Sequence, residues 1–133
     1  MNKGFKLEIV NPEKSFLLKD EVNEVVVPAF EGDMGILKDH ISIISFLKPG
    51  LVKIYDSGSK EETYYVEDGI IEFKNNCLSI LTSNIFDIKK IDKNVVREDL
   101  TQAEKDTQNK DISDQKKYLL DQKIEVLKSL ALN

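Results

Sequence analysis

The sequence is poor in the residues that build reaction centres. Its 133 residues include one cysteine, Cys77, and one histidine, His40. A single cysteine allows no internal disulfide and is typical of proteins from a reducing compartment. Neither residue occurs in the pairs or clusters that bind zinc. We therefore expect no metal site and no cofactor in this chain.

An excess of basic charge and long apolar runs are also missing. The formal net charge is −5 and the sequence pI is about 5.0, which argues against the basic surface that a nucleic-acid binder needs. No apolar run approaches the roughly 18 residues of a membrane span. Lys6 and Glu8 interrupt the apolar core that a signal peptide needs. These absences predict a soluble cytoplasmic protein that does not insert into a membrane.

Glycine and proline are absent from the second part of the chain. All six glycines and all three prolines lie before residue 70. Both residue types punctuate strands and turns, and their absence permits uninterrupted helices. Because the composition changes near residue 87, the sequence predicts two domains, residues 1–86 and residues 87–133.

The first domain is predicted to be an antiparallel β-sandwich, because short alternating or β-branched runs are separated by turn residues. Asn75 and Asn76 mark the clearest hairpin, since asparagine tolerates the positive φ of a tight turn. The second predicted strand ends at Pro28. The predicted strands are 6–10, 22–27, 41–47, 51–55, 63–66, 70–73 and 78–81.

The second domain is predicted to be an antiparallel hairpin of two helices, which makes the fold class α+β. Apolar residues recur at helical spacing on either side of a polar joint. Asp111 or Ser113 is expected to cap the second helix. These stripes can be covered by the sister helix, the sandwich or another protein. Their members are Val96, Leu100, Ala103 and Thr107, then Leu119, Leu120, Ile124, Leu127, Leu130 and Ala131.

Residues 30–45, FEGDMGILKDHISIIS, are polar and glycine-kinked in the manner of an active site. Their two glycines lack the spacing of a P-loop. A triad of Ser42, His40 and Asp39 fails, because neighbours along a strand point to opposite faces. We expect His40 to be a loop histidine bonded to backbone and Cys77 a small core residue. The residues therefore predict no catalysis.

Several short motifs follow one another in order: IVNPE at 9–13, EGDMGILKDH at 31–40, LKPG at 47–50, YVEDG at 65–69 and ID at 91–92. Together they resemble the epsilon subunits of the bacterial rotary (F-type) ATP synthase. The likeness spans nearly the whole chain, and coinciding motifs are a more specific signal than any one alone. The resemblance implies the same architecture, a sandwich followed by a helical hairpin.

The resemblance implies a function without a reaction on this chain. Epsilon subunits are non-catalytic parts of the central stalk and bind the gamma subunit and the c ring, whose proton-driven rotation supports ATP synthesis. We accordingly expect a protein at the cytoplasmic face of the bacterial inner membrane. It would be peripheral to the membrane through its partners, and a monomer when isolated.

The resemblance also implies contact sites. It assigns Glu31, Asp33 and His40 to the surface facing the polar loops of the c ring. Exposed ion pairs contribute only about 0–1 kcal/mol each, so we expect the two acids to set register rather than affinity. Lys38 and Asp39 replace the Pro-Gly usual in the family, and Asp39 is a tolerable residue for a different turn.

The hairpin is implied to be regulatory, extending along gamma to the beta subunits and blocking ATP hydrolysis. An equally good interpretation of its cations is a solvated surface interleaved with acids. Val95 stands where the ATP-binding motif of some family members has arginine, so we expect no bound ATP. The cations assigned to beta-subunit contacts are Arg97, Lys116, Lys117, Lys123 and Lys128.

A rival interpretation is a free-standing sandwich that binds a small ligand and dimerises through its helices. It predicts a concave apolar pocket and a stable homo-oligomer. The subunit interpretation predicts a monomer with an exposed apolar patch where gamma docks.

Overall fold

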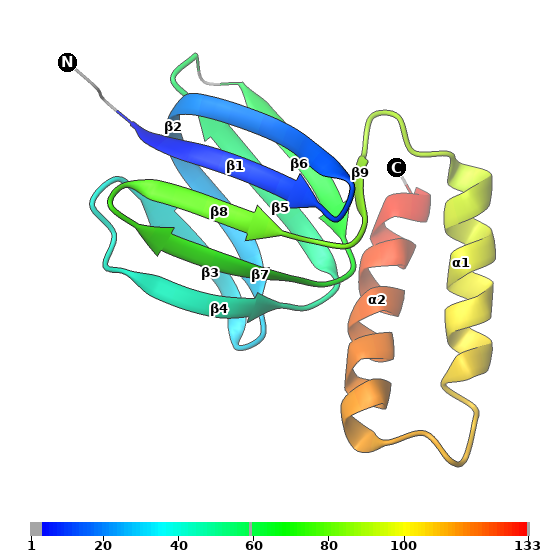
Figure 1. The fold of residues 1–133 in the computed structure, drawn as a ribbon. Helices are drawn as coiled ribbons and strands as arrows, with labels where there is room; N and C mark the ends of the chain where they lie inside the picture. The colour runs from blue at the N-terminus through cyan, green and yellow to red at the C-terminus, as the bar shows by residue number, and fades with distance from the viewer. Residues whose placement is uncertain (1–3, 59, 133) are drawn as a thin grey trace.

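The computed structural model describes residues 4–58 and 60–132. A sandwich of strands lies beside two antiparallel helices (Figure 1), which confirms the predicted α+β fold. The strands are β1 (Phe5–Asn11), β2 (Lys14–Ala29), β3 (Gly32–Leu37), β4 (Ile43–Leu47), β5 (Gly50–Asp56), β6 (Glu61–Val66), β7 (Gly69–Lys74), β8 (Cys77–Leu81) and β9 (Ile85–Asp87). The helices are α1 (Lys93–Asp106) and α2 (Asp114–Leu132).

The long strand β2 belongs to both layers of the sandwich. Its first half pairs with β1, and its second half lies between β3 and β5. One layer has the order β1-β8-β7-β4, and the other β3-β2-β5-β6-β9. The pairing of β1 with β8 is parallel, so the sandwich is antiparallel except at this pair.

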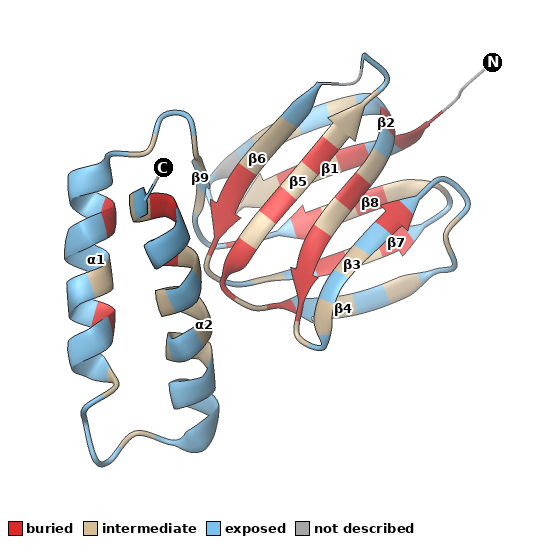
Figure 2. Cartoon of the chain, turned by 180° about the vertical axis from the view of Figure 1, so that it is seen from behind, coloured by how far each residue is buried: buried red, intermediate tan, exposed pale blue. Residues whose placement is uncertain are grey.

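The core fills the space between the two layers. Burial alternates along the strands as the pleat requires (Figure 2), so that Phe5, Leu7 and Ile9 of β1 are fully buried while the residues between them are not. Phe5 meets Phe73 edge to face, with ring centroids 5.5 Å apart. The sandwich therefore has a closely packed core of its own.

Three strand segments were not predicted: β3, β9 and the first half of β2. The two glycines and the charges of β3 look like turn residues, yet Met34 and Ile36 alternate inward and pack in the core. The end predicted for the second strand, at Pro28, falls one residue short, because β2 ends at Ala29. The ring of Pro28 nearly touches Gly50, where an added Cβ would lie 2.5 Å from that of Pro28. This close approach requires a residue without a side chain.

The predicted turn residues are confirmed. Asn75 and Asn76 have φ values of 52° and 54°, and Asp39 has 65°. Each lies in the left-handed region that asparagine and aspartate tolerate. The strand predicted for 41–47 begins later, at Ile43, because residues 38–42 form the connection that follows β3.

The helical hairpin is confirmed, and its apolar side is covered by the sister helix and by the sandwich. Val96 and Ala103 of α1 and Leu127 and Leu130 of α2 are buried. Ser113 accepts a hydrogen bond from the Lys116 N–H (3.2 Å), so of the two expected caps it is Ser113 that serves α2. The remaining stripe residues of α2 are only half-buried: Leu119, Leu120, Ile124 and Ala131. Within the described ranges, neither helix combines the length and apolar character that a bilayer crossing requires.

Candidate functional site

The connection around His40 is fixed by hydrogen bonds to the turn between β7 and β8 and by a ring contact to β7. The Asp39 N–H donates to Asn76 Oδ1 (2.7 Å), and Asn76 Nδ2 donates back to Asp39 Oδ1 (2.9 Å). His40 Nδ1 lies 2.7 Å from the Ile41 carbonyl oxygen, and the His40 ring meets Phe73 edge to face. His40 is thus bonded to backbone, as predicted, and Asp39 is engaged with Asn76 rather than with the imidazole.

The described residues show no grouping suited to metal chemistry. Across 4–58 and 60–132, no three or more histidine, cysteine, aspartate or glutamate side chains come together as a metal site. Cys77 begins β8 but is only half-buried, so its assignment to the core was wrong. Its register partners are Lys6 and Lys74.

Glu31 and Asp33 lie together at the turn between β2 and β3, and both are exposed. The turn is next to the helical hairpin (Figure 1): the Phe30 carbonyl accepts a hydrogen bond from the Tyr118 hydroxyl of α2 (3.4 Å). The Phe30 N–H donates to the Phe46 carbonyl (3.1 Å). The acidic turn is therefore braced by both the sandwich and α2.

His40 is not part of this acidic turn. It follows the opposite end of β3, away from the helices (Figure 1). Asp33 lies near the start of β3, and His40 follows the turn after its last residue, Leu37; the four strand steps from Asp33 to Leu37 alone span about 13 Å. The three residues assigned to the c ring therefore fall into two places on the surface.

The outer face of the β1-β8-β7-β4 layer carries a row of exposed apolar side chains. Phe46, Ile70 and Leu81 are register neighbours on β4, β7 and β8, and they are 59%, 42% and 51% exposed. We call these three residues the apolar row. Ile44, 67% exposed, extends it along β4. An apolar row on one sheet face is typical of a protein–protein contact.

Charged side chains follow the apolar row along the same strands, on one side of it. Glu72 pairs with Ile44 on one side and Ser79 on the other, and Ser79 pairs with Glu8. Two residues further along the strands, Lys74 and Lys6 lie on either side of Cys77. The face therefore presents an apolar row, then two carboxylates, then two ammonium groups.

A buried hydroxyl fixes the loops that end the apolar row. Thr82 is 2% exposed, and its hydroxyl donates to the Asp68 carbonyl (2.8 Å). The Ser83 hydroxyl and N–H both bond to the Asp68 carboxylate, at 2.8 Å and 3.1 Å. Because Asp68 precedes β7 and Thr82 follows β8, these bonds hold Ile70 and Leu81 in place. Sequence reasoning missed this network.

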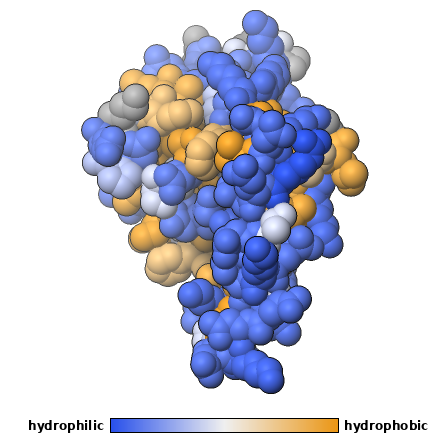
Figure 3. Space-filling model, turned by 90° about the vertical axis from the view of Figure 1, so that its right-hand side faces the viewer, coloured by the Kyte–Doolittle hydropathy of each residue, from blue (hydrophilic) through white to orange (hydrophobic). Residues whose placement is uncertain are grey.

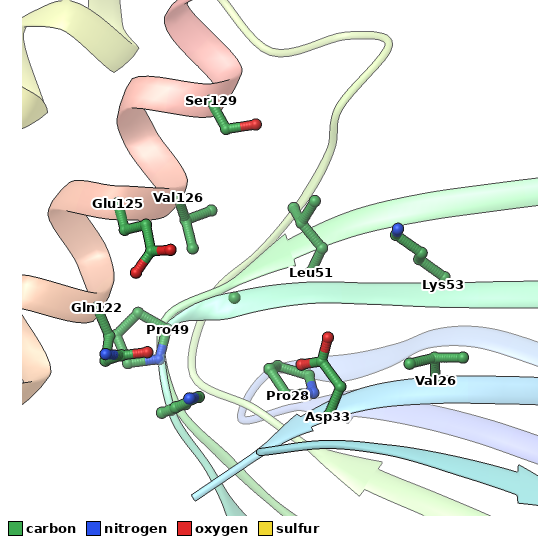
Figure 4. Close-up of a pocket in the computed structure, with 12 residues that line it drawn as sticks. Val26, Pro28, Asp33, Pro49, Leu51, Lys53, Gln122, Glu125, Val126 and Ser129 are labelled. Atoms are coloured by element: carbon green, nitrogen blue, oxygen red, sulfur yellow. The ribbon is translucent and has the colours of Figure 1, made fainter.

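A groove separates α2 from the outer face of the other layer (Figure 4). Asp33, Lys53 and Glu125 bring charges of both signs to it, beside Leu51 and Val126. Elsewhere on α2, Lys123 forms an ion pair with Glu67 of the sandwich domain, 3.2 Å long and partly buried. The mixed lining differs from the concave apolar pocket that the ligand-binding interpretation predicts.

The cations assigned to the beta subunits are placed differently from one another. Lys116, Lys117 and Lys128 are exposed on α2, and the Arg97 guanidinium donates to Asn94 Oδ1 (3.4 Å) on α1. Lys123 is half-buried in its pair with Glu67. Hydrophilic side chains predominate on the face that the hairpin presents (Figure 3).

The comparisons with known proteins agree with one another. A family model described as ATP synthase, Delta/Epsilon chain, beta-sandwich domain, matches residues 4–88. The ATP synthase epsilon chain of Pelagibacter ubique (strain HTCC1062) is 71% identical over 130 residues, covering 98% of this chain and 99% of that one. The ATP synthase epsilon chain of Dichelobacter nodosus (strain VCS1703A) is 36% identical over 105 residues, covering 79% of this chain and 73% of that one.

Two solved assemblies contain a chain of the same fold. One is the Euglena gracilis mitochondrial ATP synthase, OSCP/F1/c-ring, with a TM-score of 0.80 and 19% identity over 100% of this chain and 84% of that chain. The other is the central stalk/c-ring of the Tetrahymena thermophila mitochondrial ATP synthase, with a TM-score of 0.70 and 18% identity over 98% of both chains. The likeness extends over the sandwich and the hairpin together.

Proposed function

The chain belongs to the ATP synthase delta/epsilon chain family, and on that premise we propose that it is a non-catalytic subunit of the rotor. In this role it links the gamma subunit to the c ring while the complex makes ATP. The complex would hold it at the cytoplasmic face of the bacterial inner membrane, with its partners providing the attachment. The epsilon-chain relatives and the central-stalk assemblies of the same fold support this role over a free-standing ligand-binding protein.

The apolar row is the observation that carries the proposal. Phe46, Ile70 and Leu81 are held rigidly by strand pairing and by the Asp68–Thr82 network, yet nothing within the described residues covers them. A partner that covers them gains the hydrophobic free energy, about 25 cal/mol per Å² of apolar surface removed from water. We assign this face to the gamma subunit, with gamma cations expected opposite Glu72 and Glu8.

The c-ring contact is proposed at Glu31 and Asp33. They lie on one turn, are exposed, and are braced from behind by Phe30. A rigid acidic turn suits a partner with basic or amide groups on its loops, and it transmits lateral force without itself deforming. His40, at the far end of β3, would make a second and separate contact.

The hairpin is proposed to be the regulatory part. In this structure it is docked on the sandwich through Tyr65, Leu127 and Leu130. Extension toward the beta subunits would bring Arg97, Lys116, Lys117, Lys123 and Lys128 to acidic loops there and slow ATP hydrolysis. Lys123 must first give up Glu67. Val95 offers no guanidinium for a phosphate, so the docked form is not proposed to hold ATP.

A pull-down of tagged gamma from the same genome tests the main assignment. Ile70→Asp places a charge in the centre of the apolar row, and we expect it to weaken gamma binding at least about tenfold, because a buried unpaired carboxylate is costly. Leu37→Asp is the matched control, since Leu37 is a 56% exposed apolar residue on β3, in the other layer. Equal retention of gamma by the wild type and Ile70→Asp would remove the assignment.

A further inference from the structure

Tyr65 has a buried hydroxyl with no hydrogen-bond partner among the described residues. The side chain is 2% exposed and belongs to the small cluster where the hairpin meets the sandwich. Its buried neighbours there are Val96 of α1 and Leu127 and Leu130 of α2. These neighbours are all aliphatic, and none of their side chains can donate to the hydroxyl or accept from it.

The carboxylates near Tyr65, those of Glu67 and Asp99, make no hydrogen bond to its hydroxyl. Glu67 is engaged in its ion pair with Lys123 (3.2 Å), and Phe86 stacks on the Tyr65 ring with centroids 6.2 Å apart. Burial, followed by the carboxylates of Glu67 and Asp99, raises the pKa of Tyr65 above its usual range. The hydroxyl therefore stays protonated and unpaired while the hairpin is docked.

The free-energy cost of burying the Tyr65 hydroxyl without a hydrogen bond arises only while the hairpin is docked. In water a phenol hydroxyl makes hydrogen bonds, and burial without replacement bonds is unfavourable. When α1 and α2 leave the sandwich, Tyr65 becomes accessible to water and the cost disappears. Two polar contacts stabilise the docked state instead: the ion pair of Lys123 with Glu67 and the hydrogen bond from Tyr118 to Phe30.

The preceding residue supplies an internal contrast. Tyr64 lies on the same strand β6 but faces the sandwich core, where its hydroxyl donates to Glu62 (3.0 Å) and its ring meets Phe16 edge to face. The two tyrosines thus alternate between the two faces of one strand, as the pleat dictates. One hydroxyl is satisfied and the other is not.

We propose that Tyr65 is a release element for the hairpin: its unpaired hydroxyl destabilises the docked arrangement without weakening the sandwich. It raises the fraction of molecules whose helices are free to reach another surface. The inference rests on the proposed function only for the consequence of release, namely regulation. Release itself is a property of this chain and is measured without partners.

Hydrogen exchange followed by mass spectrometry on the full-length chain tests the inference. In Tyr65→Phe we expect the amides of α1 and α2 to exchange at least about fivefold more slowly than in the wild type, since the desolvation cost has been removed. The amides of β1, β7 and β8 should be unchanged. Tyr64→Phe is the matched control, and it should not slow exchange in the helices.

Two results would overturn the inference: helix exchange that is unchanged or faster in Tyr65→Phe, or equal slowing in Tyr64→Phe. Its failure is separable from that of the proposed function. If Tyr65→Phe slows helix exchange but leaves ATP hydrolysis by the assembled complex unchanged, the release element stands. The regulatory role of the hairpin then falls.

Discussion

The sandwich and the hairpin of this chain are stabilised to very different extents. Among the described residues, the sandwich buries a cluster of 16 apolar side chains, and the contact between hairpin and sandwich buries four. Isolated helices of this length are marginal in water, so α1 and α2 depend on that small contact and on each other. The same chain thus combines a rigid sandwich with a weakly held hairpin. A rigid surface suits binding to partner subunits, and a weakly held element suits regulation.

The largest expected effect on this difference in stability comes from removing a core side chain of the sandwich, the platform. Phe73→Ala deletes a ring that is 1% exposed and packs edge to face on Phe5 and His40. We expect a loss of about 3–5 kcal/mol in the free energy of unfolding, the usual cost of such a cavity. Chemical denaturation followed by circular dichroism measures it. The sandwich and hairpin should unfold together, because the hairpin cannot persist without its platform.

A loss below about 1 kcal/mol in Phe73→Ala, or helices that persist after the sandwich has unfolded, would show that the platform is not what supports the helices. Leu18→Ala is the matched control. Leu18 is an apolar residue of β2 that is 66% exposed, and its truncation should change stability by less than about 0.5 kcal/mol.

The contrast between the two regions was partly predictable from the sequence. Helical spacing and the absence of glycine and proline located both helices, because these signals are local. The sandwich was harder. Gly32 and Gly35 concealed β3, since what makes it a strand is its pairing with residues 24–29 of β2 and the inward packing of Met34 and Ile36. Such pairing is tertiary information that a local pattern does not contain.

The candidate site was less predictable than the fold. An exposed apolar patch was expected but not its residues, because the apolar row joins β4 to β7 and β8, and the register between distant strands cannot be read from one sequence. One signal was available: in IISFL, residues 43–47, both faces of a half-exposed strand are largely apolar. The split between the acidic turn and His40 was hidden by the same missed strand, which places them at its two ends.

A second substitution separates the hairpin from the platform. Leu127→Ala truncates a side chain of α2 that is 1% exposed in the interface cluster. We expect the docked helices to lose about 2 kcal/mol or more of stability. Their amides should exchange much faster, while the exchange rates of the core strands stay unchanged. Leu132→Ala, at a position that is 88% exposed on the same helix, is the control. Faster exchange in the sandwich to the same degree would mean that the two regions form one cooperative unit.

The smallest expected effect concerns the polar tie between the two regions. Lys123→Gln removes the charge that pairs with Glu67 across the interface, where the two side chains are 25% and 31% exposed. Because such pairs contribute up to about 1 kcal/mol, we expect helix exchange to accelerate only about two- to fivefold, and the acceleration to shrink in high salt. Lys128→Gln, on an exposed position of α2, should change nothing. If Lys128→Gln accelerated exchange as much as Lys123→Gln, general helix charge rather than the pair with Glu67 would govern docking. The pair of Lys123 with Glu67 would then not be a specific latch between the hairpin and the platform.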